Sequence, residues 1–460
     1  MTSIERHNEQ QPAPSYLTVS SLRAELPCVS SEVTNADTFC WRLIIWAIGI
    51  SIVVLTAIQP RRFIVGEIDA VKVSPLAQSV SIGLTILFLL IAFFAMTILV
   101  LKKNDRSDRL KVKIYCFLFI LLSLLPTISD FIRGVPIKGL SLALVTIAMY
   151  LTSYFLAAPS VTWWVREVRI MMLILFIYGS LVSSLVFPEW AWSLGYDVES
   201  STSLFSMRLF GTVNHPNSLA PIAVFYFLLG LFPGTRLKGE FLHTIATILV
   251  FLFAQSKTIW GVTAFLYGIH LLMMYFKMSK KNKLWFLTIS VPCLSAIFVF
   301  LSYSSSTNRF FSDLMLDSQV STFTGRLAIW LLAIEMWLAS PWIGQGFGAW
   351  STQASMLDKV SSLGFSATHA HNQILQVLSQ SGLVGLGVFI MFMVSYFKTM
   401  NKMPEHIRSI IIWLSALFIL HGSTEVVIQY NLGSGSTLTT WVLISLVMII
   451  GKRQVYSKIN

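Results

Sequence analysis

The chain has 460 residues, of which 55% are hydrophobic and only 12% are charged, and its formal net charge is +12. A typical soluble domain carries about 25% charged residues, so the composition excludes an ordinary soluble protein and indicates a polytopic membrane protein. The positive charge does not call for nucleic acid, because Lys and Arg gather in short loops, as they do on the cytoplasmic side of a lipid bilayer.

Residues 1–40 are polar and lack the basic start and apolar core of a signal peptide, so we predict a flexible cytoplasmic tail. The four cysteines have no paired spacing, which predicts neither a disulfide framework nor a cysteine metal site.

About twelve apolar stretches follow, each near the roughly 20 residues that a bilayer crossing needs. They cover residues 41–59, 79–101, 112–129, 136–157, 168–187, 216–232, 240–255, 258–276, 284–303, 383–399, 407–422 and 437–451. The predicted fold is therefore an all-α integral membrane protein. Transmembrane helices 1–9 lie in 41–303, a large loop in 304–382, and helices 10–12 with a short cytoplasmic end in 383–460.

The loops alternate in charge along the chain. Most of the 33 Lys and Arg residues lie in "KKNDRSDRLKVK", "REVR", "TRLKG", "KMSKKNK", "KTMNKMPEHIR" and "GKRQVYSK". The positive-inside rule then places both termini in the cytoplasm. Segments 188–215, 255–257, 304–382 and 423–436 are predicted to lie on the outer side.

The segment 304–382 is far longer than a connector needs, and loops of that length are usually functional. It contains "TGRLAIWLLAIEMWLAS", whose apolar surface is too short for a confident crossing. We predict an interfacial helix there. A thirteenth crossing is the alternative, but it would break the alternation of charge.

The outer segments hold several cations beside apolar sequence. In "MRLFGTVNHPNSLAP", Pro216 suits the first turn of a helix, and the N–H groups of that helix start could bind an anion together with Arg208. His215 and Asn217 flank this position as supporting residues. The alternative is that Arg208 reaches to lipid phosphates at the membrane surface.

Two further cations share the predicted side. Lys257 stands between two apolar stretches, and Arg326 begins the predicted interfacial helix. A cation at a helix N-terminus opposes the helix dipole, which suggests another partner such as a phosphate. The alternatives are an interfacial anchor for Lys257 and a solvated or lipid-facing Arg326.

The stretch "THAHNQILQVLSQSGLVGLG" holds the best candidate for proton transfer. Thr368 can cap a helix that begins near His369, which would place His371 on one face with Leu375 and Leu378. Histidine suits general acid or base work near neutral pH, although packing or hydrogen bonding is the common role of a single histidine at a membrane edge. His369 would point to a different side and support His371.

A metal is not predicted. His369 and His371 form a His-x-His pair, but a catalytic metal wants three ligands or more, and the outer acids Asp313, Asp317, Asp358 and Glu425 show no suggestive spacing. Glu425 follows "HGST" and is the most interesting outer acid as a possible base, with an ordinary loop acid as the alternative.

These motifs together resemble the O-antigen ligase and polymerase family of bacterial envelope membrane proteins. The most specific element is His371-Asn372, nine residues, then Gly382-x-x-Gly385. "RLFGTVNHPNSLA" resembles the family's Arg, Gly and His-Pro-Asn segment. "TGRLAIW" and "SPWIGQGFGAW" resemble its large loop, with the family's Pro and Gly recurring as Pro341, Gly344, Gly346 and Gly348. One departure is Lys257, because many members carry Arg there; a Lys supplies charge without the bidentate fork.

The resemblance implies inverting, metal-independent glycosyl transfer at the periplasmic face of the bacterial inner membrane, with no cofactor. The donor would be an undecaprenyl-diphosphate-linked glycan, and the acceptor a hydroxyl of another glycan (polymerase) or of lipid A core (ligase). The segments "GFGAW" and "HAHNQILQVLSQSGLVGL" resemble exopolysaccharide polymerases more than ligases, which favours a polymerase. Within this scheme His371 is the base, and Arg208, Arg326 and Lys257 bind the diphosphate. His369, Asn372, His215 and Asn217 support them. Other envelope-glycan assembly proteins are expected partners.

Two other classes compete. A secondary transporter would carry polar or charged residues at mid-membrane, whereas here nearly all of them lie at the edges of apolar stretches. A membrane-bound acyltransferase would also use an edge histidine, but it would not need three outer cations.

Overall fold

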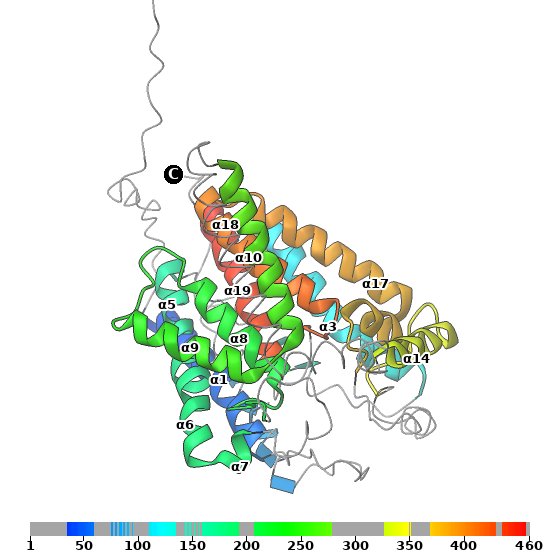
Figure 1. Cartoon of the computed structure of the whole chain (residues 1–460). Helices are drawn as coiled ribbons and strands as arrows, with labels where there is room; N and C mark the ends of the chain where they lie inside the picture. The colour runs from blue at the N-terminus through cyan, green and yellow to red at the C-terminus, as the bar shows by residue number, and fades with distance from the viewer. Residues whose placement is uncertain are drawn as a thin grey trace, which may run out of the picture.

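The computed structural model describes residues 35–58, 110–134, 159–192, 207–277, 326–348, 350, 369–428 and 435–456, with scattered positions in 75–94 and 143–156. These residues form helices joined by turns, with one isolated bridge between Trp192 and Leu209. The helices, shown in Figure 1, are α1 (Asn35–Ile58), α3 (Leu110–Ile132), α5 (Val161–Met172), η2 (Leu173–Tyr178), α6 (Gly179–Val186), α7 (Pro188–Ala191), α8 (Pro216–Leu229), α9 (Glu240–Ala254), α10 (Lys257–Lys277), α14 (Arg326–Ala339), α17 (Gln373–Met400), α18 (Glu405–Gly422) and α19 (Gly435–Tyr456).

The prediction of an all-helical membrane protein is confirmed. Four helices in the described part of the chain are long and apolar enough to cross a bilayer by length and composition: Asn35–Ala57, Val161–Val186, Lys257–Phe276 and Gln373–Met400. The count of about twelve crossings stays a prediction. The apolar stretches 79–101 and 136–157 are described only at scattered positions, and 284–303 lies outside the described residues.

Helix α8 lies at the centre of the bundle and contacts α5, α9, α10, α18 and α19. It is buried on most sides, as expected of a helix that is apolar all round. Tryptophan side chains pack the first and last helices, α1 and α19, against this core. Trp164 of α5 packs edge-on against Trp41 of α1, with ring centroids 6.3 Å apart, and lies 5.6 Å from Trp441 of α19.

The helix predicted within the long loop is α14, which Figure 1 shows in yellow beside α17. Its 14 residues are too few for a crossing. Ile329, Ala333 and Met336 form its buried face, and Leu331 and Leu338 remain exposed on the opposite face. The remainder of the long loop, 304–325 and 351–368, lies outside the described residues.

Helix α17 is interrupted at Gly382, whose φ of 61° and ψ of −157° are not helical. The predicted start of the helix is wrong. α17 begins at Gln373, and its cap is the side chain of Asn372 rather than Thr368, which lies outside the described residues.

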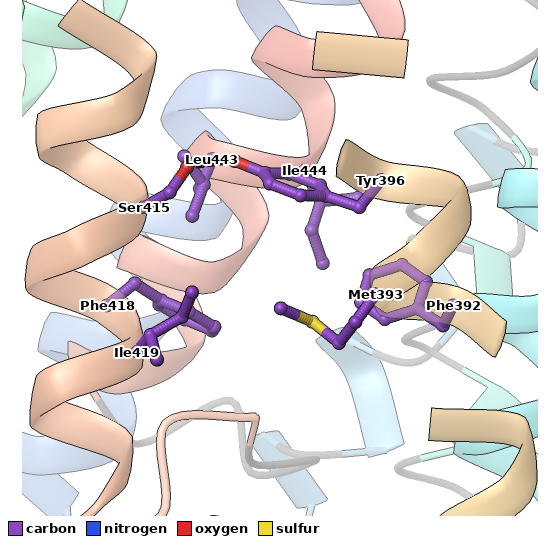
Figure 2. A pocket seen from close by; sticks show the side chains of 8 residues that line it. All are labelled: Phe392, Met393, Tyr396, Ser415, Phe418, Ile419, Leu443 and Ile444. Atoms are coloured by element: carbon purple, nitrogen blue, oxygen red, sulfur yellow. Dashed lines mark hydrogen bonds between the residues drawn. The ribbon is translucent and has the colours of Figure 1, made fainter. Parts of the chain in front are cut away.

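A small crevice lies between α17, α18 and α19 (Figure 2). Its lining is mainly apolar, and the hydroxyl groups of Tyr396 and Ser415 hydrogen-bond to each other. The crevice therefore presents no group suited to acid–base or nucleophilic work, and the chemistry has to be sought elsewhere.

Candidate active site

Side chains from the starts of α8 and α14 and from the residues before α17 meet at the carboxylate of Glu425, between α18 and α19. Its Oε1 accepts hydrogen bonds from Arg326 Nη2 and Asn217 Nδ2, each at 2.9 Å. Its Oε2 lies 2.9 Å from His371 Nδ1 and 3.5 Å from His369 Nε2. The side chain of Glu425 is buried, whereas both histidine side chains are about 25% exposed. Within the described residues, the histidines are therefore more accessible to solvent than the carboxylate that they contact.

The start of α17 fixes His371 against this carboxylate. Asn372 Oδ1 accepts hydrogen bonds from the N–H groups of Ile374 and Leu375, which caps the helix. Its Nδ2 donates to the carbonyl of Ser423, two residues before Glu425, at 3.0 Å. Asn372 thus holds the two sides of the cluster together, and its role in supporting the reaction stays a prediction.

His371 itself precedes the helix, so the predicted helical face shared with Leu375 and Leu378 is wrong. Its backbone φ of 48° lies in the left-handed region, which residues other than glycine rarely adopt. Such strain persists only where the surroundings hold it, and it is commonest at functional sites. The turn aims the imidazole at Glu425 instead of along the helix surface.

Gln373, the first residue of α17, holds the loop that carries Glu425 in place. Gln373 Oε1 accepts hydrogen bonds from the N–H groups of Val427 and Ile428, at 3.0 and 2.8 Å. Thr440 of α19 donates to the carbonyl of Val427. The Glu425 loop is therefore fixed to both α17 and α19, and it cannot shift without breaking buried hydrogen bonds.

Arg208 joins the cluster through Asn217. Its Nη2 donates to Asn217 Oδ1 at 3.1 Å, and its Nε donates to the carbonyl of Ala254 at the end of α9, at 3.4 Å. The neighbouring Leu209 N–H bonds the carbonyl of Phe253. The loop that carries Arg208 is therefore docked on the turn between α9 and α10.

His215 caps α8, where Pro216 takes the first helical position as predicted. The Asn217 N–H donates to His215 Nδ1 at 3.0 Å, so this N–H is not open to an external anion as the sequence suggested. Burial, with a smaller contribution from the Arg208 charge, lowers the pKa of His215 to about 3. The imidazole of His215 is therefore neutral near pH 7. It has to be neutral, because Nδ1 can accept the Asn217 N–H only when it carries no proton.

This capping predicts an acid-sensitive fold. The folded-state pKa of His215 lies below its ordinary value of 6.5, so the stability that neutral His215 provides is present above pH 6.5 and is lost as pH falls toward 3. We expect the thermal unfolding midpoint in lipid nanodiscs to fall by about 5 °C between pH 7.5 and 5. His215→Asn keeps a capping oxygen that does not titrate, and should show a smaller fall. An equal fall in both proteins would contradict the assignment.

The electrostatics of the cluster favour an ionised Glu425 and a neutral His369. Burial alone would raise the pKa of the Glu425 carboxyl, but its contacts with His369 and His371 and the Arg326 charge hold the pKa well below its usual value. Burial lowers the pKa of His369. A carboxylate facing His371 Nδ1 favours the tautomer with the proton on Nδ1, which leaves Nε2 able to accept one.

We predicted from their spacing that the two histidines point to different sides, and this prediction is wrong. Their ring centroids are 4.1 Å apart with planes tilted by 39°, and both rings face Glu425. The expected helical geometry does not exist at these residues, because the helix begins only at Gln373.

Lys257 is the first residue of α10, three residues beyond the Ala254 carbonyl that accepts from Arg208. Its side chain is exposed. Its role in diphosphate binding stays a prediction.

A metal can also be considered at this place. The ligand atoms of His369, His371 and Glu425 lie within 4.8 Å of one another, a set that sequence spacing missed because Glu425 is 54 residues from His371. Two histidines and a glutamate form a known zinc ligand set. However, Arg326 already bonds the same carboxylate, and its charge opposes a second cation there.

Part of the chain is similar to a known protein family. Residues 242–390 match the family described as O-antigen ligase. Residues 242–390, which are similar to this family, are here called the O-antigen ligase region. No curated protein matches the sequence.

The O-antigen ligase region contributes only part of the cluster. It contains Lys257, Arg326, His369, His371 and Asn372. The remaining members lie outside it: Arg208, His215, Asn217 and Glu425. The fold therefore completes, from both flanks of the O-antigen ligase region, a cluster that this region alone does not contain.

Proposed function

We propose that the chain transfers a glycan from an undecaprenyl-diphosphate-linked donor to a sugar hydroxyl at the periplasmic face of the bacterial inner membrane. The observation that carries the proposal is the Glu425 carboxylate, which bonds His371 and Arg326 in one cluster. It gives an oriented imidazole and a cation side by side within a family of O-antigen ligases. The arrangement supplies a base for the acceptor and a counter-charge for the leaving group.

The proposed step is one in-line displacement. The acceptor oxygen attacks the anomeric carbon and forms the new glycosidic bond. Its proton passes to His371 Nε2, while the bond from the anomeric carbon to the diphosphate oxygen breaks. The bonding electrons leave with the polyprenyl diphosphate, so the product has the opposite anomeric configuration. Glu425 stabilises the imidazolium that forms, as carboxylates do for histidine bases elsewhere.

The leaving diphosphate needs positive charge in place of a metal. Arg326 bonds Glu425 through Nη2, and a guanidinium has five N–H donors, so Arg326 can bind phosphate oxygens while it keeps this partner. Arg208, which bonds Asn217, supplies a second positive charge beside the cluster. Lys257 would add a third positive charge from the start of α10. A lipid-linked donor also suits the exposed apolar face of α14, the helix that begins with Arg326.

We favour a polymerase, in which the acceptor is a second lipid-linked glycan, over a ligase, in which it is lipid A core. The test uses the purified protein in lipid vesicles with polyprenyl-diphosphate glycan from its host. Glycan ladders with release of polyprenyl diphosphate are expected. Release only after addition of lipid A core would point to the ligase. No release with a verified donor and both acceptors would contradict glycosyl transfer.

Metal removal provides a separate prediction. Because Arg326 already neutralises Glu425, we expect turnover to change less than about twofold after dialysis against EDTA, and no recovery to be needed from Mg²⁺, Mn²⁺ or Zn²⁺. The measurement is the initial rate of polyprenyl diphosphate release. Loss of activity in EDTA that a single divalent ion restores would place a metal on His369, His371 and Glu425 and contradict a metal-independent mechanism.

A further inference from the structure

The break in α17 is closed by a segment from another part of the chain. The residues that follow α14, from Pro341 to Gly346, run beside the break. The N–H groups of Gln345 and Gly346 donate to the carbonyls of Ser379 and Gln380, at 2.7 and 3.0 Å. On the far side of Gly382, the N–H groups of Leu383 and Val384 donate to the carbonyls of Pro341 and Trp342, at 2.8 and 3.1 Å. The segment thus takes up backbone groups on both sides of the break.

This pairing links the two halves of the candidate active site. The bonded segment directly continues α14, which begins at Arg326, and the broken helix begins two residues after His371. Side chains at Gly344 and Gly382 would collide with the opposite backbone, which explains the glycines at these positions. The elements that carry Arg326 and His371 are therefore joined through one backbone-bonded unit. This unit is defined here as the latch and comprises residues 341–348 and 379–384.

The end of α3 holds the latch in place. The buried Asp130 accepts a hydrogen bond from the Gly348 N–H at 3.3 Å. Its carboxylate also lies where a side chain at Gly346 would have to be. The backbone of α3 contributes as well, because the carbonyl of Pro126 accepts from the Phe347 N–H at 3.2 Å.

Two neighbours of Asp130 extend the same contact. The Ser129 hydroxyl donates to the carbonyl of Ile343, and Arg133 Nη1 donates to the carbonyl of Gly344 at 3.4 Å. One end of α3 therefore bonds four residues of the latch: Ile343, Gly344, Phe347 and Gly348. These bonds do not involve the Glu425 cluster itself.

We propose that Asp130 is a positioning residue, which sets the placement of Arg326 relative to His371 by anchoring the latch to α3. A buried carboxylate at the end of an apolar helix is costly unless it is paired, and here it holds the turn at Gly346–Gly348. This proposal deepens the proposed function, since it concerns the same site. Its structural readout needs no substrate, so it can fail independently of the chemistry.

The test measures the distance between α14 and α17 directly. Spin labels are placed at Leu331→Cys and Ile390→Cys, both exposed positions, in a background in which the four native cysteines are replaced by Ala. Pulsed electron resonance in nanodiscs should give a narrow distance distribution for the parent protein. Asp130→Ala should broaden or shift it and lower kcat at least about tenfold, because small misplacements of positioned groups are costly.

Matched variants separate positioning from general damage. Asp130→Asn keeps an oxygen that can accept from Gly348 and should restore the narrow distribution. Glu167→Ala removes a carboxylate that bonds Arg42 and Trp46, and should leave distribution and kcat unchanged. If Asp130→Ala does not fold, Asp130→Ser, whose hydroxyl is too short to reach Gly348, should show the same broadening. An unchanged distribution in a folded Asp130→Ala or Asp130→Ser protein, or broadening in Asp130→Asn, would overturn the proposal.

Discussion

Replacement of His371 by Ala is expected to lower kcat for glycosyl transfer about 1000-fold, because a positioned general base contributes roughly 100- to 10,000-fold. The donor KM should change by less than about threefold, since the diphosphate is bound by cations rather than by the imidazole. Initial rates of polyprenyl diphosphate release at varied donor concentration give both constants.

Three matched variants sharpen this result. His371→Gln offers Glu425 a hydrogen bond but no proton acceptor of suitable basicity, so it should be as slow as His371→Ala. His369→Ala removes the second imidazole beside the same carboxylate and should cost about tenfold or less, given that this ring orients rather than accepts. His270→Ala, on α10 against Trp413, is a distant control. A His371→Ala protein with at least a tenth of wild-type kcat would refute the base assignment.

Glu425→Gln should lower kcat about 100-fold while the protein stays folded. The amide can still accept from Arg326 and Asn217 through one oxygen, but it carries no charge to stabilise the imidazolium of His371. Glu425→Ala should be slower still and less stable by about 3 kcal/mol, because it leaves the Arg326 cation without its partner in a largely buried place. The measurements are single-turnover rates and thermal unfolding midpoints in nanodiscs.

The paired variants discriminate between a catalytic and a purely structural role of the carboxylate. If Glu425 only holds the fold, Glu425→Gln should retain nearly full kcat and Glu425→Ala should lose rate only in proportion to unfolded protein. Fast turnover by a folded Glu425→Gln protein would therefore contradict the proposed partnership with His371. Glu167→Gln, which changes a carboxylate in the Arg42 contact, controls for the loss of charge itself.

The helices were the predictable part of the fold. Long apolar stretches such as 258–276 and 407–422 correspond to α10 and α18 within two residues, because burial in lipid requires continuous apolar length. Helix ends were less predictable. Thr368 and Asn372 both have capping side chains, and only the contact of Asn372 with Ser423 shows which one begins α17.

The residue types at the candidate site, cations and histidines, could be predicted from the sequence. Their spatial arrangement around Glu425 could not. Arg326 and His371 could be singled out by residue type and position in their segments. Glu425 could not be paired with them, since it lies 99 and 54 residues away, and only the packing of α17 against the loop after α18 brings it near. The "HGSTE" sequence at a helix end was the one available signal. The left-handed turn at His371 carries no sequence signature of its own.

The most direct test of the central claim is the anomeric configuration of the new glycosidic bond, read by NMR from product made by the purified protein from a donor of known configuration. Single displacement at the His371–Glu425 cluster predicts the opposite configuration to the donor, with one polyprenyl diphosphate released for each bond formed. The same configuration as the donor, or bond formation without diphosphate release, would contradict it.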